Sequence, residues 1–159
     1  HLGSFTNSKH QAHTATITPR SGPKLVLAKP TTLMNLSGRA VRKLIDFYRV
    51  DPSTDLLVVC DDFALDLGTL RLRGAGSHGG QNGLRDIIAQ LGSQAFPRLR
   101  CGIGPVPPRS NPAGFVLTPF KASERPEVDD LVERAALACL TWSSDGVEAA
   151  QARFNGTGG

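Results

Sequence analysis

Segments with the periodicity of β-strands alternate along this chain with segments of helical periodicity. Strand patterns cover five segments, at residues 12–18, 24–28, 56–60, 69–73 and 98–103. Helical patterns cover residues 37–48, 81–91 and 124–142. Such alternation favours an α/β fold, which we expect to be a mixed twisted β-sheet covered by helices on both faces.

Several segments carry more specific expectations. Residues 12–18 and 24–28 flank a Pro- and Gly-containing turn and predict a hairpin, whereas no strand is expected before residue 12. The run LLVVC at 56–60 is continuous and apolar, which is typical of a strand buried on both faces. Residues 105–112 are Pro-rich and predict a loop.

The length of the chain fits one domain. With 159 residues, we expect a single domain over residues 1–154, followed by a frayed tail at 155–159. The apolar side of the helix at 124–142 is expected to present Leu131, Ala135, Leu137, Ala138 and Trp142.

The composition is that of an ordinary globular protein. Hydrophobic residues make up 40% and charged residues 20%, and no apolar run approaches the ~18 residues of a membrane span. The three cysteines contain no C-x-x-C spacing, so we expect buried free thiols and a reducing compartment. That compartment is the cytoplasm, or an organelle if a targeting segment lies upstream.

The charge is unevenly distributed. Residues 124–148 hold seven acidic and two basic side chains, a net of −5, so the rest of the chain carries +9 of the total of +4. This basic part is suited to a polyanionic partner, although an ordinary solvated surface rich in Lys and Arg explains it equally well.

The stretch GSHGGQNGLRDII at 76–88 raises three possibilities: a phosphate loop, a catalytic segment or a simple turn. Gly74, Gly76 and Gly79 spell the dinucleotide-binding pattern G-x-G-x-x-G. However, the preceding strand alternates Leu with Arg, and Leu99 stands where a ribose-binding acid is expected ~20 positions on. The loop is also too long for the tight turn of that motif, so the dinucleotide interpretation is the weakest of the alternatives.

Polar side chains follow other predicted strands. Asp61 and Asp62 come directly after the apolar run, where ligand sites form in open α/β sheets. Arg73 and Arg100 lie on the polar sides of two alternating strands. Asn82 opens the helix after the glycine stretch, where it is either a plain helix cap or a functional amide.

Five segments in order and in register resemble bacterial-type peptidyl-tRNA hydrolases. They are KPTTLMNLSG (29–38), DDFALDLG (61–68), the glycine stretch, FPRLRCGIGPVPP (96–108) and NPAGFVL (111–117). Together they cover nearly the whole chain, which is far more specific than one glycine pattern. The resemblance implies a peptidyl-tRNA hydrolase-like fold and cleavage of the ester between peptide and tRNA 3′ end during translation quality control.

The resemblance also implies the catalytic groups. In this family water cleaves the ester without a metal or other cofactor, and a His acts as general base. Asp61 matches the Asp that orients this base. Asn35 and Asn82 match amides that hold the peptide main chain and the reacting water, a task suited to a group that both donates and accepts hydrogen bonds.

The resemblance implies the substrate-binding residues as well. Met34 precedes Asn35 in its motif, and Arg73 and Arg100 match the basic pair that grips the 5′ phosphate of the tRNA. Gln81 stands where the family usually has His, and His78 matches a His of the glycine stretch. The implied partner is peptidyl-tRNA, with the ribosome or another RNA as further candidates, and we expect a monomer that does not bind membranes.

Two departures from the family pattern leave an alternative open. The family's first strand and the motif carrying its base His have no counterpart in these 159 residues, so we expect the sheet to lack its first strand and the chain alone to be inactive. Cys60, Ala64 and Gln81 also differ from the usual family residues. They favour the alternative of an inactive family member, an RNA- or ribosome-binding factor similar to organelle splicing factors.

Overall fold

The computed structural model describes residues 4–158, and its contacts group the chain into two compact units. The first comprises His1–Leu56 and Gly74–Pro97, and we call it the hairpin unit. The second comprises Leu57–Arg73 and Arg98–Gly159, and we call it the mixed-sheet unit.

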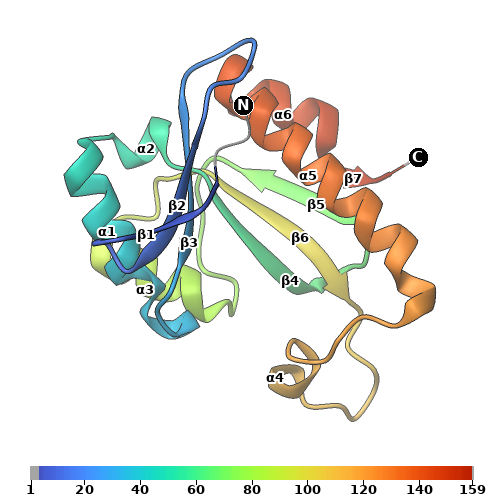
Figure 1. Cartoon of the computed structure of the whole chain (residues 1–159). Coiled ribbons are helices and arrows are strands. Elements are labelled where there is room, and N and C mark those ends of the chain that lie inside the picture. The colour runs from blue at the N-terminus through green and yellow to red at the C-terminus, as the bar shows by residue number, and fades with distance from the viewer. Residues whose placement is uncertain (1–3, 159) are drawn as a thin grey trace. The chain divides into compact units, whose positions relative to one another are not determined.

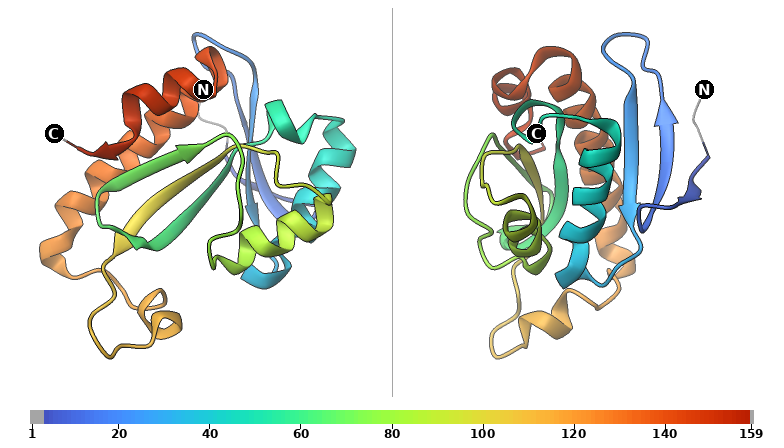
Figure 2. Two further views of the ribbon diagram at one scale, coloured as in Figure 1. Left: turned by 180° about the vertical axis from the view of Figure 1, so that it is seen from behind. Right: turned by 90° about the vertical axis from the view of Figure 1, so that its left-hand side faces the viewer.

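The hairpin unit contains a three-stranded antiparallel sheet. Strands β1 (Thr6–Ser8), β2 (Ala12–Ile17) and β3 (Leu25–Pro30) lie in that order, drawn in blue in Figures 1 and 2. The β2–β3 hairpin confirms the strand prediction from the alternating residues. The expectation of no strand before residue 12 is wrong, because β1 pairs with β2, with Ser8 opposite Ala12.

The two predicted helices of the hairpin unit begin and end close to their predicted residues. They are α1 (Ser37–Tyr48), which follows the 3-10 turn η1 (Met34–Leu36), and α3 (Asn82–Leu91). The short helix α2 (Pro52–Asp55) was not predicted. Helices α1 and α3 pack closely at Gly38, whose N–H donates to the Asp86 carboxylate at 2.7 Å. A Cβ at Gly38 would lie 2.5 Å from the main-chain oxygen of Asp86, so only glycine allows this approach.

The mixed-sheet unit contains the strands β4 (Val58–Asp66), β5 (Thr69–Arg73), β6 (Arg98–Gly104) and β7 (Gly156–Thr157). Their order is β4-β6-β5-β7, with β4 and β6 parallel and the other two pairs antiparallel. The α/β class and the mixed sheet are confirmed. The described strands nevertheless form two sheets, one in each unit, instead of the one sheet predicted.

Strand β4 differs from its prediction. It stands at the end of the strand order, with β6 as its neighbour, and Val59 is 51% exposed. Burial on both faces, expected from the run LLVVC, is therefore wrong. An apolar run reports the character of the side chains but not the number of strands or helices that come to cover them.

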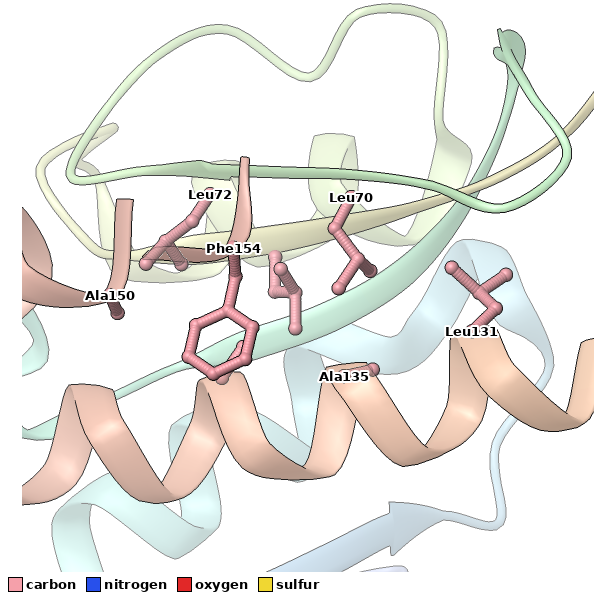
Figure 3. Close-up of a cluster of buried hydrophobic side chains, with 8 residues drawn as sticks. Leu70, Leu72, Leu131, Ala135, Ala150 and Phe154 are labelled. Carbon is pink, nitrogen blue, oxygen red and sulfur yellow. The ribbon is translucent and has the colours of Figure 1, made fainter. Parts of the chain in front are cut away.

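Helices α5 (Arg125–Asp145) and α6 (Val147–Phe154) pack on one face of the mixed sheet (Figure 3). Eight buried side chains form this core: Leu70, Leu72, Leu99, Leu131, Ala135, Ala138, Ala150 and Phe154. Burying each leucine stabilises the fold by about 1.5–3 kcal/mol. Trp142 packs against the cluster as predicted for α5, whereas Leu137 is 45% exposed and does not belong to the apolar side.

The end of the chain is more ordered than predicted. Helix α6 was not expected, and β7 pairs with β5, with Gly156 opposite Leu70, so residues 156 and 157 do not form a frayed tail. Gly159 and residues 1–3 lie outside the described residues.

The Pro-rich loop after β6 is as predicted and leads to the short helix α4 (Pro112–Phe115) and the turn η2 (Ala122–Glu124). Within residues 4–158, no helix has both the length and the hydropathy to cross a membrane.

Candidate functional site

Two segments of the hairpin unit bring amide side chains to one region. The Met34 sulfur lies 3.6 Å from Nε2 of Gln81, which places η1 beside the start of α3. A Cβ at Gly83 would lie 2.7 Å from the same sulfur, so a larger residue there would displace the Met34 side chain from its present position. Because Asn35 follows Met34 and Asn82 follows Gln81, the two asparagines come from segments that touch each other.

Gln81, not Asn82, caps helix α3. The Gln81 side-chain oxygen accepts a hydrogen bond from the Leu84 N–H at 2.8 Å, and Asn82 is the first residue inside the helix. The helix-cap interpretation of Asn82 is therefore wrong. Gln81, a departure from the usual family His, has a defined structural task at this position.

Both asparagine side chains are exposed. Asn35 lies in η1 and Asn82 in the first turn of α3. Among the described residues, neither side chain takes part in an internal hydrogen bond. Their donors and acceptors are thus available to a ligand, and an amide is able to bind a peptide group through both.

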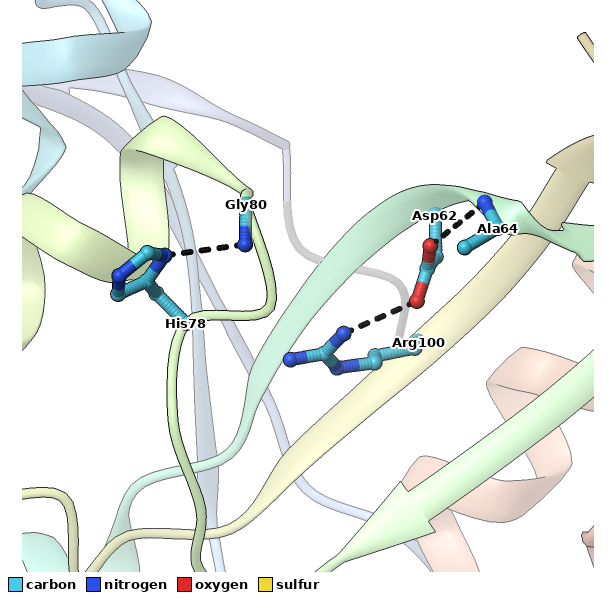
Figure 4. A network of polar contacts seen from close by, with 5 residues as sticks. All are labelled: Asp62, Ala64, His78, Gly80 and Arg100. Carbon is cyan, nitrogen blue, oxygen red and sulfur yellow. Dashed lines mark hydrogen bonds and ion pairs between the residues drawn. The ribbon is translucent and has the colours of Figure 1, made fainter.

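His78 stabilises the glycine stretch locally. Its Nδ1 accepts a hydrogen bond from the Gly80 N–H at 3.0 Å (Figure 4). Gly79 and Gly80 both have positive φ, of 56° and 86°, which bends the chain tightly around the imidazole. With Nδ1 accepting, a neutral ring carries its proton on Nε2.

In the mixed-sheet unit, the two predicted acids have different surroundings. Asp62 pairs with Arg100 at 3.0 Å and accepts the Ala64 N–H at 2.9 Å (Figure 4). The side chains of this ion pair are only 10% and 16% exposed. Asp61 stands opposite Cys101 in the register of β4 and β6, so strand alternation directs it to the other side of the sheet from Asp62.

The arginines of β5 and β6 share one face of the mixed sheet. Arg71 stands opposite Arg100 and Arg73 opposite Arg98, which makes Arg73 and Arg100 diagonal neighbours. Burial, and then the charge of Arg100, lower the pKa of Arg98. Arg71 and Arg98 were not predicted as site residues, although they belong to the same Leu–Arg alternation as Arg73 and Arg100.

Sheet topology excludes the dinucleotide interpretation of the glycine stretch. That motif requires the strands before and after the helix to be parallel, but β5 and β6 are antiparallel. Within the described part of the chain, no group of three or more His, Cys, Asp or Glu side chains is arranged to hold a metal ion.

All three cysteines are free and half-buried, close to the prediction of buried thiols. Burial raises the pKa of Cys60 and Cys101 to about 12 and that of Cys139 to about 11. A thiol with such a pKa is not a nucleophile near neutral pH. Cys60 therefore offers neither a nucleophile nor a general base near neutral pH.

Comparison with known proteins decides the family. The family model for peptidyl-tRNA hydrolase matches residues 1–158. The chain belongs to the peptidyl-tRNA hydrolase family. It is 46% identical to the peptidyl-tRNA hydrolase of Chlorobaculum parvum over 155 residues, which is 96% of this chain and 80% of that protein. It is also 46% identical to the enzyme of Lachnoclostridium phytofermentans, over 84% of this chain and 70% of that protein.

A solved structure supports the same assignment. The crystal structure of peptidyl-tRNA hydrolase from Acinetobacter baumannii matches with a TM-score of 0.86 at 27% identity. The match covers 96% of this chain and 79% of that one. The peptidyl-tRNA hydrolase fold thus extends over almost the whole chain.

The predicted site residues of this peptidyl-tRNA hydrolase family member are divided between the two units. The hairpin unit holds Met34, Asn35, His78, Gln81 and Asn82. The mixed-sheet unit holds Asp61, Arg73 and Arg100. Asp62 had no predicted role, although its place beside Asp61 was a usable signal that it is the partner of Arg100.

Proposed function

We propose that this protein hydrolyses peptidyl-tRNA at the ester between the peptide and the 3′ end of the tRNA. The observation that carries the proposal is the match to the peptidyl-tRNA hydrolase family over residues 1–158. Peptidyl-tRNA forms during translation, so we propose that the protein acts in the compartment where translation takes place.

Asn35 and Asn82 are proposed to hold the peptidyl end of the substrate. The support is that both side chains are exposed, come from touching segments and lack internal hydrogen bonds among residues 4–158. Met34 contacts Gln81 from η1 and is 57% exposed, which leaves apolar surface for a peptide side chain. His78 and Gln81, held by the loop and the helix, are proposed to shape the same surface.

Arg73 and Arg100 are proposed to bind the 5′ phosphate. Like charges directly opposite each other destabilise a sheet, and two such arginine pairs share one face here. A phosphate bound by Arg73 and Arg100 would add negative charge to this positively charged face. Arg100 uses a donor for Asp62, but a guanidinium has five, so its ion pair is compatible with phosphate binding.

Asp61 is proposed to orient a histidine general base. A histidine is the usual general base for ester hydrolysis near neutral pH. The mixed-sheet unit, which holds Asp61, contains no histidine, and Gln81 does not take up a proton. We therefore propose that the 159 residues by themselves hydrolyse peptidyl-tRNA slowly. Loss of a general base typically lowers the rate by ~10²–10⁴-fold.

The test is single-turnover hydrolysis of a labelled peptidyl-tRNA. The 159-residue chain is compared with the same chain preceded by a segment that carries the strand and the base-His motif implied by the family resemblance. We expect hydrolysis with the extended chain and its loss in the Asn35→Ala and Asn82→Ala variants of that chain. Rapid turnover by the 159 residues alone would show that the base assignment is wrong. Binding of tRNA without turnover in either chain would replace hydrolysis by the RNA-binding alternative.

A further inference from the structure

The side chain of Asn155 binds the main chain of Leu72 through two hydrogen bonds. Its Oδ1 accepts from the Leu72 N–H at 2.6 Å, and its Nδ2 donates to the Leu72 carbonyl at 3.3 Å. Gln151 donates to the same carbonyl from Nε2 at 3.0 Å. Three side-chain hydrogen bonds thus converge on one residue of β5.

These bonds continue a strand ladder at the point where it ends. In an antiparallel pair, alternate residues direct their main-chain groups toward the neighbouring strand. On the outer side of β5, Leu70 pairs with Gly156 of β7, and Leu72 is the next residue whose groups point that way. Asn155 precedes β7 and takes the place of the next strand residue with its amide.

Leu72 lies between Arg71 and Arg73, which point to the opposite face of the sheet. Leu72 itself is fully buried, so its main-chain groups have no ready replacement partner in water. Loss of the Asn155 amide would leave the Leu72 N–H without its hydrogen-bond partner and the Leu72 carbonyl with the bond from Gln151 alone. The last residues of β5 would then be held mainly by hydrogen bonds on the side of β6. The first side chain affected beyond Leu72 is that of Arg73.

We propose that Asn155, assisted by Gln151, is a positioning residue for Arg73. It fixes the end of β5 so that the Arg73 guanidinium meets the 5′ phosphate of the tRNA together with Arg100. This inference rests on the proposed function, in which Arg73 binds that phosphate. It adds Gln151 and Asn155 to the determinants of tRNA affinity.

The test measures the affinity of the protein for tRNA with and without its 5′ phosphate. The dissociation constant for tRNA without the phosphate, divided by that for tRNA with it, isolates the phosphate contact. Partial unfolding lowers both affinities equally and leaves this ratio unchanged. Asn155→Ala should reduce this ratio roughly threefold or more, since a misplacement of ~1 Å can cost up to ~100-fold. Amide exchange of Leu72 should become faster in the same variant.

Two further variants make the result specific. Asn155→Asp keeps the acceptor for the Leu72 N–H but turns a second acceptor toward the Leu72 carbonyl, so it should restore the ratio only in part. Leu131→Val removes a buried methylene from the same core and so lowers stability without removing a hydrogen bond of β5. It should leave the ratio as in the wild type. If Asn155→Ala does not fold, Gln151→Ala should show a smaller drop of the same kind.

The outcomes separate this inference from the proposed function. An unchanged ratio in folded Asn155→Ala, with a ratio near one in Arg73→Ala, would overturn the positioning role and leave the phosphate role intact. An unchanged ratio in Arg73→Ala would overturn the phosphate role and the positioning role with it. A ratio lowered equally by Leu131→Val would show that general destabilisation, not Asn155, is the cause.

Discussion

At the scale of single residues, Gln81 and Asn82 are neighbours at the start of α3, but only Gln81 caps the helix. We predict that Gln81→Ala lowers the free energy of unfolding by ~1 kcal/mol, as loss of a helix cap does. Asn82→Ala should change it by less than ~0.5 kcal/mol, because the side chain is exposed. Urea denaturation of both variants tests this difference, and a larger loss for Asn82→Ala would contradict the assignment.

The Gln81→Ala and Asn82→Ala substitutions should also differ in their effect on catalysis. In the extended chain we expect Asn82→Ala to lower kcat and kcat/KM together, as loss of an interaction made in the transition state does. Gln81→Ala should leave kcat closer to that of the wild type. A change in KM alone for Asn82→Ala would instead indicate uniform binding of substrate and transition state.

Also at the residue scale, the buried thiols should make the free energy of unfolding depend on pH. Burial raises the pKa of Cys60 and Cys101 to about 12, whereas an unfolded cysteine has a pKa of ~8.5. Between these values the unfolded chain releases its thiol protons first, so the free energy of unfolding falls as pH rises. We expect a smaller fall from pH ~8.5 to ~10.5 in the Cys60→Ala/Cys101→Ala variant. Equal falls in both proteins, measured by urea denaturation, would contradict the raised pKa values.

At the scale of the elements, the contact between α1 and α3 depends on Gly38. A Cβ there would lie 2.5 Å from the Asp86 oxygen and 2.7 Å from Cγ of Gln90. The helix backbone cannot yield easily, so Gly38→Ala should lower the free energy of unfolding by ~1–3 kcal/mol. Gly114→Ala in α4 is the control, since no atom lies within 4 Å of its added Cβ. Equal stability of the two variants would show that the helices separate at little cost.

At the scale of the whole molecule, the basic face of the mixed sheet should govern the salt dependence of tRNA binding. Replacing both Arg73 and Arg100 by Ala removes two proposed phosphate contacts. The slope of log affinity against log salt concentration should then fall by ~1–2 units, at about 0.9 per contact. A variant with Lys121→Ala and Arg125→Ala loses the same net charge and should keep the wild-type slope. Equal slopes in the two double variants would contradict the phosphate assignment.

Local patterns in the sequence were sufficient for most elements. The helical spacing at 37–48 gave the bounds of α1, and the Leu–Arg alternation gave β5 with its apolar and basic faces. Such patterns suffice because a single helix or strand has a fixed period, and side chains at that period share one face. The family motifs added the site residues by resemblance, which the periodicity alone does not supply.

Tertiary structure decided which groups become partners. The pairing of Asn155 with Leu72 joins residues 83 positions apart, and that of Asp62 with Arg100 joins residues 38 apart. The edge position of β4 and the division of the strands into two sheets depend likewise on contacts between distant segments. A sequence pattern reports the burial that each side chain favours. The hydrogen-bond partner and the neighbouring strand are settled only when the folded chain brings distant residues together, since each buried polar group must then find a partner.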